Sequence, residues 1–305
     1  MAHDRNQASL WDYLKNIFLL LLFIQFLPPL IQGIKKQYGK LLESQAQVGV
    51  IPIRGVLYNS SKYNKELITF FKDPAIKAIL LKIECPGSAA GTGQALFNEI
   101  IQLKKLHPKP VIVLVENVCA SGGYYIASAA DYIISSGTAT IGSIGTYLPA
   151  FQLKEFIEQF KIQYSPIKTG TYKTITDPFT DKTPEEKALL QEFSDDVYKQ
   201  FTESIATQRK LSLANINLWA DGKIFTARQA LKLGLIDEIG SAQNAIQIIK
   251  QKALIDGEIE WVHPPAESNW AWLLGNDNDS DDESLLKISI HSVCDFIQER
   301  FIHHG

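Results

Sequence analysis

A serine lies between small residues in the stretch Cys119-Ala120-Ser121-Gly122-Gly123, which follows the apolar run 111–115 and precedes an apolar helical stretch that reaches Ala130. A serine held at a turn between a strand and a helix exposes its hydroxyl, as the nucleophiles of acyl transfer do. Gly122 would let the next amide help to stabilise an oxyanion. The alternative is a serine that caps a helix, with glycines that allow close packing. Cys119 is a rival nucleophile, although its place nearer the strand favours a small buried hydrophobic residue.

A serine nucleophile needs a base, and the histidines lie far from it in the sequence. The chain has six histidines, and none lies between His107 and His263. His107 precedes Pro108, where we expect a solvent-facing helix end. Lysine is the other candidate base, but its ordinary pKa near 10.4 means that it must be desolvated or lie near positive charge. Lys173 is the lysine of interest, because its loop 169–174 holds aromatic and hydroxyl side chains and no acids; the alternative is a solvated surface lysine.

Two further turns carry groups that a nucleophilic serine could use. Cys85-Pro86-Gly87-Ser88 follows a buried apolar run, and Gly87 has no Cβ, so a substrate carbonyl could approach its amide closely. Gly142-Ser143-Ile144-Gly145 presents a hydroxyl that could orient a lysine or contact a substrate. Taken alone, each turn could equally be an ordinary loop between two elements.

The elements that must position these residues alternate along the chain. Short runs rich in Val, Ile and Leu predict buried strands, and the stretches between the first three of them have helical patterns. The predicted strands are 48–53, 78–83, 111–115 and 132–135, and the predicted helices between them are 61–71 and 93–106. This alternation predicts an α/β domain with a mainly parallel sheet, in which sites form at the carboxyl ends of the strands.

The second half of the domain continues with helices. Thr183, Pro184 and Glu186 form a capping box with a proline at the first helical position, so a long helix should run to about Arg209. A helix over 226–233, a strand over 235–238 and a helix over 242–252 follow. A polar loop, 168–182, precedes the long helix.

The two ends of the chain differ from the middle. Residues 17–31 form an apolar run that is polar only at Gln25 and contains Pro28 and Pro29. A membrane anchor, the apolar part of a cleaved signal peptide and a buried helix all remain possible; an uncleaved anchor is our first interpretation. Residues 266–305 hold eight acids and two basic residues. We expect a solvated linker there, followed by an amphipathic helix that packs on its own domain or contacts a partner or membrane.

Composition limits the classes of function. The 305 residues are 46% hydrophobic and 21% charged, which is ordinary for a globular protein. The net charge of −3 gives no overall basic field for nucleic acid. Three cysteines at wide spacing, without a CxxC pair, argue against a disulfide framework or a cysteine-based metal site. We expect an anchor and linker over 1–44, a catalytic domain over 45–260 and the acidic tail over 261–305.

Taken together, the chemical motifs resemble the signal peptide peptidase A family in its short, single-repeat form. The matching pieces come in the family's order, cover about residues 45–255, and are specific as a set although each is weak alone. They are the Pro-Gly turn at 86–87, ASGGYYIA at 120–127, GSIG at 142–145, GTYK at 170–173, and DGKIFTARQA at 221–230 followed by LGLID at 233–237. One departure is Ser88, which stands where the family usually has a second glycine.

The resemblance implies a role for each matched residue. Ser121 would be the nucleophile, Lys173 the general base, Ser143 the hydroxyl that orients the lysine, and Gly87 and Gly122 the amides of the oxyanion hole. The implied fold is the α/β Clp protease/crotonase type, a ββα superhelix with a mainly parallel sheet flanked by helices. No metal or organic cofactor is expected.

The resemblance also implies partners and a place in the cell. The implied protein is a serine endopeptidase that hydrolyses remnant signal peptides or other apolar membrane-associated peptides, with no nucleic-acid partner. A homo-oligomeric ring would supply the lysine from a neighbouring subunit. A single-pass anchor would hold it in the bacterial inner membrane, with the catalytic domain on the periplasmic side, although the charges that flank residues 17–31 slightly favour the opposite orientation. The alternatives are a crotonase-like acyl-CoA enzyme, which usually has a glutamate base, and a catalytically silent membrane scaffold.

Overall fold

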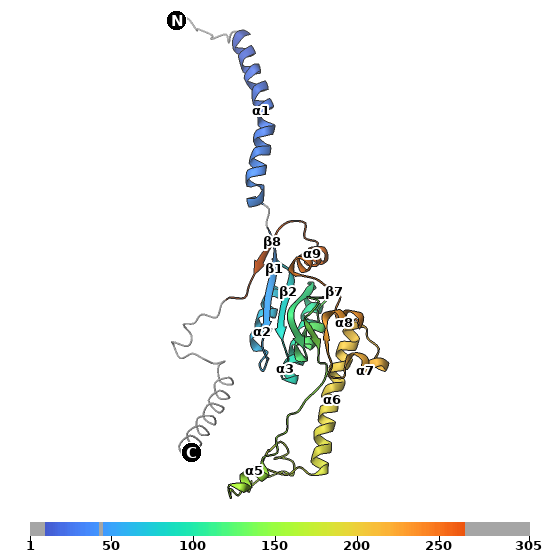
Figure 1. Ribbon diagram of the computed structural model, residues 1–305. Coiled ribbons are helices and arrows are strands. Elements are labelled where there is room, and N and C mark those ends of the chain that lie inside the picture. The colour runs from blue at the N-terminus through green and yellow to red at the C-terminus, as the bar shows by residue number, and fades with distance from the viewer. Residues whose placement is uncertain (1–9, 43–44, 266–305) are drawn as a thin grey trace, which may run out of the picture. The chain divides into compact units, whose positions relative to one another are not determined.

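The computed structural model describes residues 10–42 and 45–265 (Figure 1). The chain divides into two compact units, Met1–His263 and Pro264–Gly305. Almost all of the second unit, including the predicted acidic linker and amphipathic helix, lies outside the described residues. The fold below is that of the first unit.

The N-terminal apolar run belongs to helix α1 (Leu10–Leu42), which continues through Pro28 and Pro29. Its large apolar side chains from Tyr13 to Phe26 are mostly more than half exposed. No helix in the described part of the chain is both long and apolar enough to cross a membrane. The predicted transmembrane anchor therefore finds no support here.

A single eight-stranded sheet organises the rest of the unit. Its strands are β1 (Ala46–Arg54), β2 (Ile76–Cys85), β3 (Val111–Ala120), β4 (Tyr132–Ser135), β5 (Thr140–Gly142), β6 (Ile224–Thr226), β7 (Glu238–Ile239) and β8 (Ile259–Val262). The main path runs β6-β5-β3-β2-β1-β8, and β4 pairs with both β3 and β7. Every pairing is parallel except β5 with β6. The prediction of a mainly parallel sheet is confirmed.

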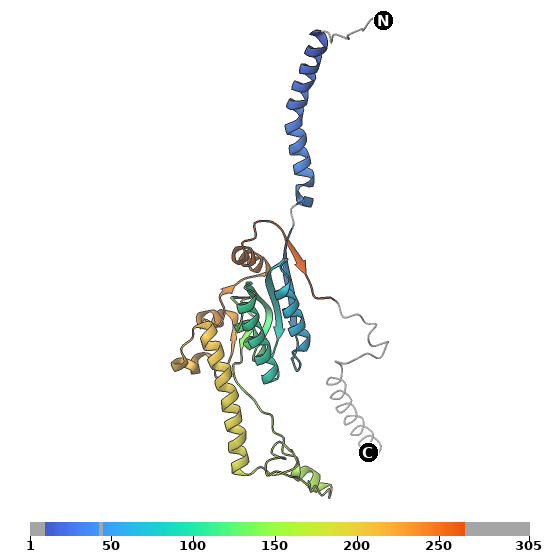
Figure 2. The same ribbon diagram turned by 180° about the vertical axis from the view of Figure 1, so that it is seen from behind.

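Helices cover both faces of the sheet (Figure 2). They are α2 (Ser61–Lys72), α3 (Ala90–Leu106), α4 (Gly122–Ser128), α5 (Lys154–Gln159), α6 (Pro184–Arg209), α7 (Ile216–Trp219), α8 (Ala227–Lys232) and α9 (Ala242–Ala253), with a 3₁₀ turn at Leu213–Asn215. Alternate strand residues point to opposite faces, so β3 sends Val113 into the core beneath α3 and α4 and Ile112 into the core beneath α9. The predicted α/β layering with flanking helices is confirmed.

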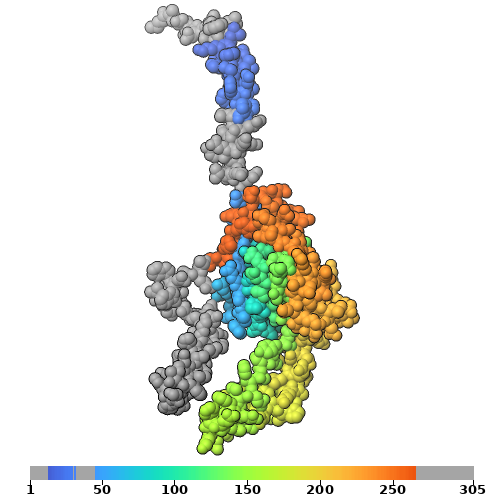
Figure 3. Space-filling model, in the orientation of Figure 1, coloured from blue at the N-terminus to red at the C-terminus, as the bar shows by residue number. Residues whose placement is uncertain are grey.

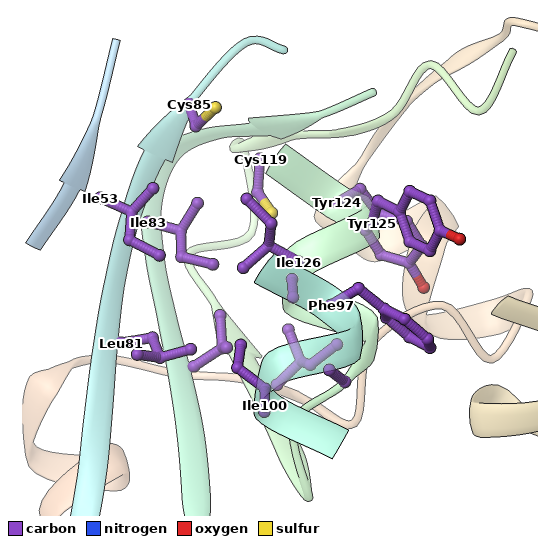
Figure 4. Close-up of a cluster of buried hydrophobic side chains, with 14 of the residues drawn as sticks. Ile53, Leu81, Ile83, Cys85, Phe97, Ile100, Cys119, Tyr124, Tyr125 and Ile126 are labelled. Carbon is purple, nitrogen blue, oxygen red and sulfur yellow. The ribbon is translucent and has the colours of Figure 1, made fainter. Parts of the chain in front are cut away.

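The larger core lies directly beneath the strand ends that carry the candidate site. Figure 4 shows side chains from β2, β3, α3 and α4 meeting between the sheet and the helices. At one end of this core the rings of Phe97 and Phe201 lie 4.8 and 4.5 Å from the ring of Tyr125. The buried Tyr124 hydroxyl donates to the Leu235 carbonyl at 2.6 Å. These contacts fix α4, and hence the turn that precedes it.

The structure changes several predicted boundaries. β3 does not end at Val115 but continues to Ala120, because a bulge lets it pass through the polar residues 116–117. The strand predicted over 235–238 forms instead at Glu238–Ile239, since Leu235 and Ile236 are buried in the core before the pairing with β4 begins. β5, β6 and β8 were not predicted, because their three or four residues are too few for a clear pattern.

Helix α6 begins as predicted. The Thr183 hydroxyl accepts from the Glu186 amide at 3.1 Å, and the Glu186 carboxylate accepts from the Thr183 amide at 2.9 Å. The chain between β5 and α6 includes α5 and has mostly exposed side chains (Figures 1 and 3). We call residues 147–182 the arm. The predicted polar loop, 168–182, contains its turns over 169–180.

Candidate active site

Three turns meet at the carboxyl ends of neighbouring strands. One follows β2 and carries Gly87, one follows β3 and carries Ser121, and one follows β5 and carries Ser143. They border a cavity of about 780 Å³ whose far wall is one face of α6. This is the edge at which open parallel sheets form their sites.

Ser121 adopts a backbone conformation that residues other than glycine rarely adopt. Its φ is 50° and its ψ is −125°, angles close to those of the first central residue of a type II′ turn, where glycine dominates. The Ser121 amide donates to the Gly142 carbonyl at 2.7 Å, and its carbonyl accepts from the Tyr125 amide at 2.9 Å. Both peptide groups are therefore anchored, while the hydroxyl has no hydrogen-bond partner among the described residues and lines the cavity.

Gly87 lies beside this hydroxyl. A Cβ built on Gly87 would stand 3.8 Å from the Ser121 Oγ, in ordinary contact. The Gly87 carbonyl accepts from the Leu57 amide at 3.1 Å, and the Leu57 carbonyl accepts from the Ala89 amide at 2.8 Å. These bonds fix the turn but leave the Gly87 amide without a backbone acceptor in the described part of the chain. The turn of Gly87 therefore lies directly beside the Ser121 hydroxyl.

Position 122 has room for glycine but not for a residue with a Cβ atom. A Cβ there would lie 1.9 Å from the Ser88 Oγ and 2.8 Å from the Ser88 backbone nitrogen. As the first residue of α4, Gly122 has an amide with no intrahelical acceptor. The backbones of Gly87 and Gly122 thus both lie close to the Ser121 side chain, where the amides of an oxyanion hole would have to be.

Ser143 reaches the same cavity on a second strained turn. Its φ is 51°, and the preceding Gly142 has a φ of 102°. The Ser143 amide donates to the Lys223 carbonyl at 2.7 Å, and the Gly222 amide donates to the Ile144 carbonyl at 3.0 Å. The antiparallel pairing of β5 with β6 therefore holds Ser143 next to the turn of Ser121.

Lys173 lies away from the cavity of Ser121 within the single chain. It is exposed, and its Nζ has no hydrogen-bond or ion-pair partner among the described residues. It lines a different, shallow cavity of about 430 Å³ within the arm. Tyr172 beside it contacts Glu185, eight residues before Phe193 on α6, or about 12 Å along the helix from the wall of the serine's cavity.

The rival groups are poorly placed for catalysis. Cys119 is fully buried, and desolvation by burial raises its pKa well above the ordinary thiol value. Such a thiol stays protonated at neutral pH and is inert as a nucleophile. His107 caps the C-terminal end of α3, about 25 Å along the helix from Ala90, which lines the cavity. Neither Cys119 nor His107 lines the cavity that holds Ser121.

The sequence prediction missed the outer wall of the cavity. Phe193, Val197 and Phe201 face it from α6 at four-residue spacing. The Thr146 hydroxyl lies 2.8 Å from the Ser194 hydroxyl, which ties the turn of Ser143 to this helix. The four-residue spacing was visible in the sequence, but only the fold shows which element this face meets. The wall makes the cavity largely apolar next to the serine.

A strained serine at the carboxyl ends of parallel strands, with the turns of two glycines beside it, is suited to acyl transfer from a carbonyl substrate. Residues 104–256 match Peptidase family S49, a range that includes Ser121, Ser143 and Lys173. The chain belongs to Peptidase family S49, which confirms the resemblance to the signal peptide peptidase A group.

Named relatives agree with this family. The chain is 35% identical over 182 residues to "Putative protease MJ0651" of Methanocaldococcus jannaschii, covering 60% of this chain and 58% of that protein. It is 35% identical over 191 residues to "Putative protease slr0021" of a Synechocystis species, covering 62% and 68%. It is 30% identical over 218 residues to "Putative signal peptide peptidase SppA" of Enterococcus faecium, covering 71% and 63%. The matched part thus spans between 58% and 68% of these relatives.

One solved structure has a weaker likeness. A mutant of the 1510-N membrane-bound stomatin-specific protease covers 72% of this chain and 99% of its own, with 17% identity and a TM-score of 0.48. The fold described above rests on the strand pairing of this chain and not on that likeness.

Proposed function

We propose that this protein is a serine endopeptidase whose nucleophile is Ser121. The observation that carries the proposal is the anchored, strained backbone of Ser121, whose side chain lines a cavity next to the turns of Gly87 and Gly122. Membership of Peptidase family S49 supports peptide bonds as the substrate class. The largely apolar α6 wall favours apolar side chains next to the cleaved bond.

We further propose that Lys173 of a neighbouring copy is the general base. In one chain the lysine lies in the arm, outside the cavity of the serine. The arm carries many exposed apolar side chains, among them Tyr147, Phe151 and Ile167, and such sets favour contact with another protein. A ring of copies would cover this surface and bring a lysine to each serine.

The proposed reaction uses the serine, the lysine and the two glycine amides. Neutral Lys173 accepts the Ser121 proton as Oγ attacks the peptide carbonyl, and the amides of Gly87 and Gly122 stabilise the oxyanion. One such donor is worth about 2.7–4 kcal/mol. The protonated lysine gives its proton to the leaving amine, and water then hydrolyses the acyl-enzyme. Ser143, in the same cavity, would orient the incoming lysine.

The natural substrates are proposed to be remnant signal peptides or similar apolar peptides near a membrane. The exposed apolar side chains of α1 favour association with a lipid surface. For a bacterial protein we propose the inner membrane, with the catalytic unit on the periplasmic side.

The test is hydrolysis of an internally quenched apolar peptide by the full-length protein in detergent. We expect steady cleavage by the wild type and a loss of about 10⁴-fold or more in kcat for Ser121→Ala, since removing a serine nucleophile has an effect of this order. A long-chain acyl-CoA in place of the peptide tests the crotonase-like alternative. Cleavage of the thioester but not of the peptide, or equal peptide cleavage by Ser121→Ala, would refute the proposal.

A further inference from the structure

Strand β3 changes its neighbour just before it delivers Ser121. Residues 112–115 pair with β4, and residues 118–120 pair with β5. On the other side β3 stays with β2, but Ile83 pairs with Val115 and Cys85 pairs with Cys119. Two residues on β2 therefore face four on β3, and the surplus forms a bulge at 116–117. The geometry of this bulge sets where the last residues of β3, and so the serine, are held.

One carboxylate fills the bulge. Glu84 Oε1 accepts from the backbone amides of Glu116 and Asn117, both at 3.1 Å, and Glu84 Oε2 accepts from the Asn117 side-chain Nδ2 at 3.1 Å. Hydrogen bonds to a carboxylate are stronger than those between neutral groups. A half-buried side chain of β2 thus takes up both amides that the irregular pairing leaves without a partner strand.

The same residue leads into the oxyanion turn. Glu84 stands three positions before Gly87, and its carbonyl accepts from the Gly55 amide at 3.0 Å. Gly55 opens the segment whose Leu57 brackets the turn through its bonds to Gly87 and Ala89. Glu84 is therefore joined to the segment that holds the oxyanion amide and to the strand that holds the nucleophile.

We infer that Glu84 is a positioning residue for the reaction: it fixes the separation between the Ser121 hydroxyl and the Gly87 amide by clamping the β3 bulge to the end of β2. Glu84 does not line the cavity, so it would act on the reaction only through the residues that it holds. The inference rests on the proposed peptidase function. It predicts that the length and acceptor oxygens of this side chain matter more than its charge.

The test compares three variants of the full-length protein in the peptide assay. Glu84→Gln keeps the length and one oxygen for the two amides, and Asn117 can rotate its own amide to suit the new group, so kcat should stay within about threefold of wild type. Glu84→Asp keeps the charge but is one methylene shorter, and Glu84→Ala removes the acceptor. Both should lower kcat on the order of 10- to 100-fold with little change in KM, because small misplacements of reacting groups have effects of this size.

Glu116→Ala is the matched control, because it removes an exposed side chain of the same bulge and leaves the amide that Glu84 holds. We expect it to behave as wild type. If Glu84→Ala does not fold, the comparison of Glu84→Asp with Glu84→Gln decides the matter. Near-wild-type kcat in Glu84→Asp, or equal losses in Glu84→Gln and Glu84→Asp, would overturn the inference. An inactive wild type would instead refute the proposed function.

Discussion

Ser121 holds its strained backbone only because its surroundings impose it. A non-glycine residue in such a region costs on the order of 1–3 kcal/mol. The strain is offset by the bonds of its amide and carbonyl, to Gly142 and Tyr125, and by the buried helix that follows. A residue with no chemical role would be replaced by glycine at lower cost, so the strain itself supports the assignment of Ser121 as the nucleophile.

The glycines around the serine differ in what they tolerate. Gly122→Ala would place a methyl against the Ser88 backbone, so we expect this variant to lose most of its activity and to unfold at lower temperature. Gly91 also lines the cavity, but a Cβ there meets nothing within 4 Å. Gly91→Ala lies in helix α3 and should raise the free energy of unfolding by about 0.5–1 kcal/mol. Thermal unfolding and peptide cleavage of both variants check this; a fully active, stable Gly122→Ala protein would show that the close packing is wrong.

At the scale of elements, one end of helix α6 packs in the core and the other end is largely exposed. Phe201 is buried in the aromatic stack with Tyr125, whereas Phe193, two turns earlier, is 58% exposed. The C-terminal end of α6 thus belongs to the core, the cavity wall spans the middle of the helix from Phe193 to Phe201, and the N-terminal end leads back to the arm. The stability of that first half depends on local interactions more than on burial.

The capping box is the local interaction that we can test. Thr183→Ala removes the acceptor of the Glu186 amide and should lower the free energy of unfolding by about 1 kcal/mol. Hydrogen exchange of the first-turn amides of α6 should speed up, while Thr183→Ser, which keeps the hydroxyl, should leave it unchanged. Unaltered exchange in Thr183→Ala would mean that contacts with the arm, and not the cap, hold this end.

The sequence predicts elements whose pattern is local and misses those that depend on distant partners. β1 and β2, helices α2, α3, α6 and α9, and the capping box all follow from runs, periodicity and caps within about ten residues. The bulge in β3 did not, because its polar residues look like the end of a strand until Glu84 from another strand is placed against them. The short strands β5 and β6 form only because residues more than 80 positions apart pair.

Some residues of the candidate site could also be placed from the sequence, and one could not. Gly87, Ser121, Gly122 and Ser143 follow apolar runs, so the sequence predicts their convergence at one edge of the sheet. Lys173 lies in an arm whose contacts within one chain do not reach that edge. Its place would be fixed by a second copy, and pairing between chains leaves no periodic signal in a single sequence.

At the scale of the whole molecule, a site shared between copies predicts complementation. Ser121→Ala and Lys173→Arg subunits should each be inactive, because arginine stays protonated and cannot act as a base. Co-expressed with different tags, they should form mixed assemblies in which some interfaces join an intact serine to an intact lysine. Partial recovery of peptide cleavage in doubly purified assemblies is the expected result. Mixed assemblies without any activity would place both groups in one chain.

The most direct measurement is the reaction of the full-length protein with a fluorophosphonate, followed by mass spectrometry of its peptides. Such a probe forms a stable adduct only with an activated serine. We predict a single adduct on Ser121 that is lost in Ser121→Ala and strongly reduced in Lys173→Arg. An adduct on Ser143 or another serine, or no adduct in a protein that cleaves peptides, would contradict Ser121 as the nucleophile.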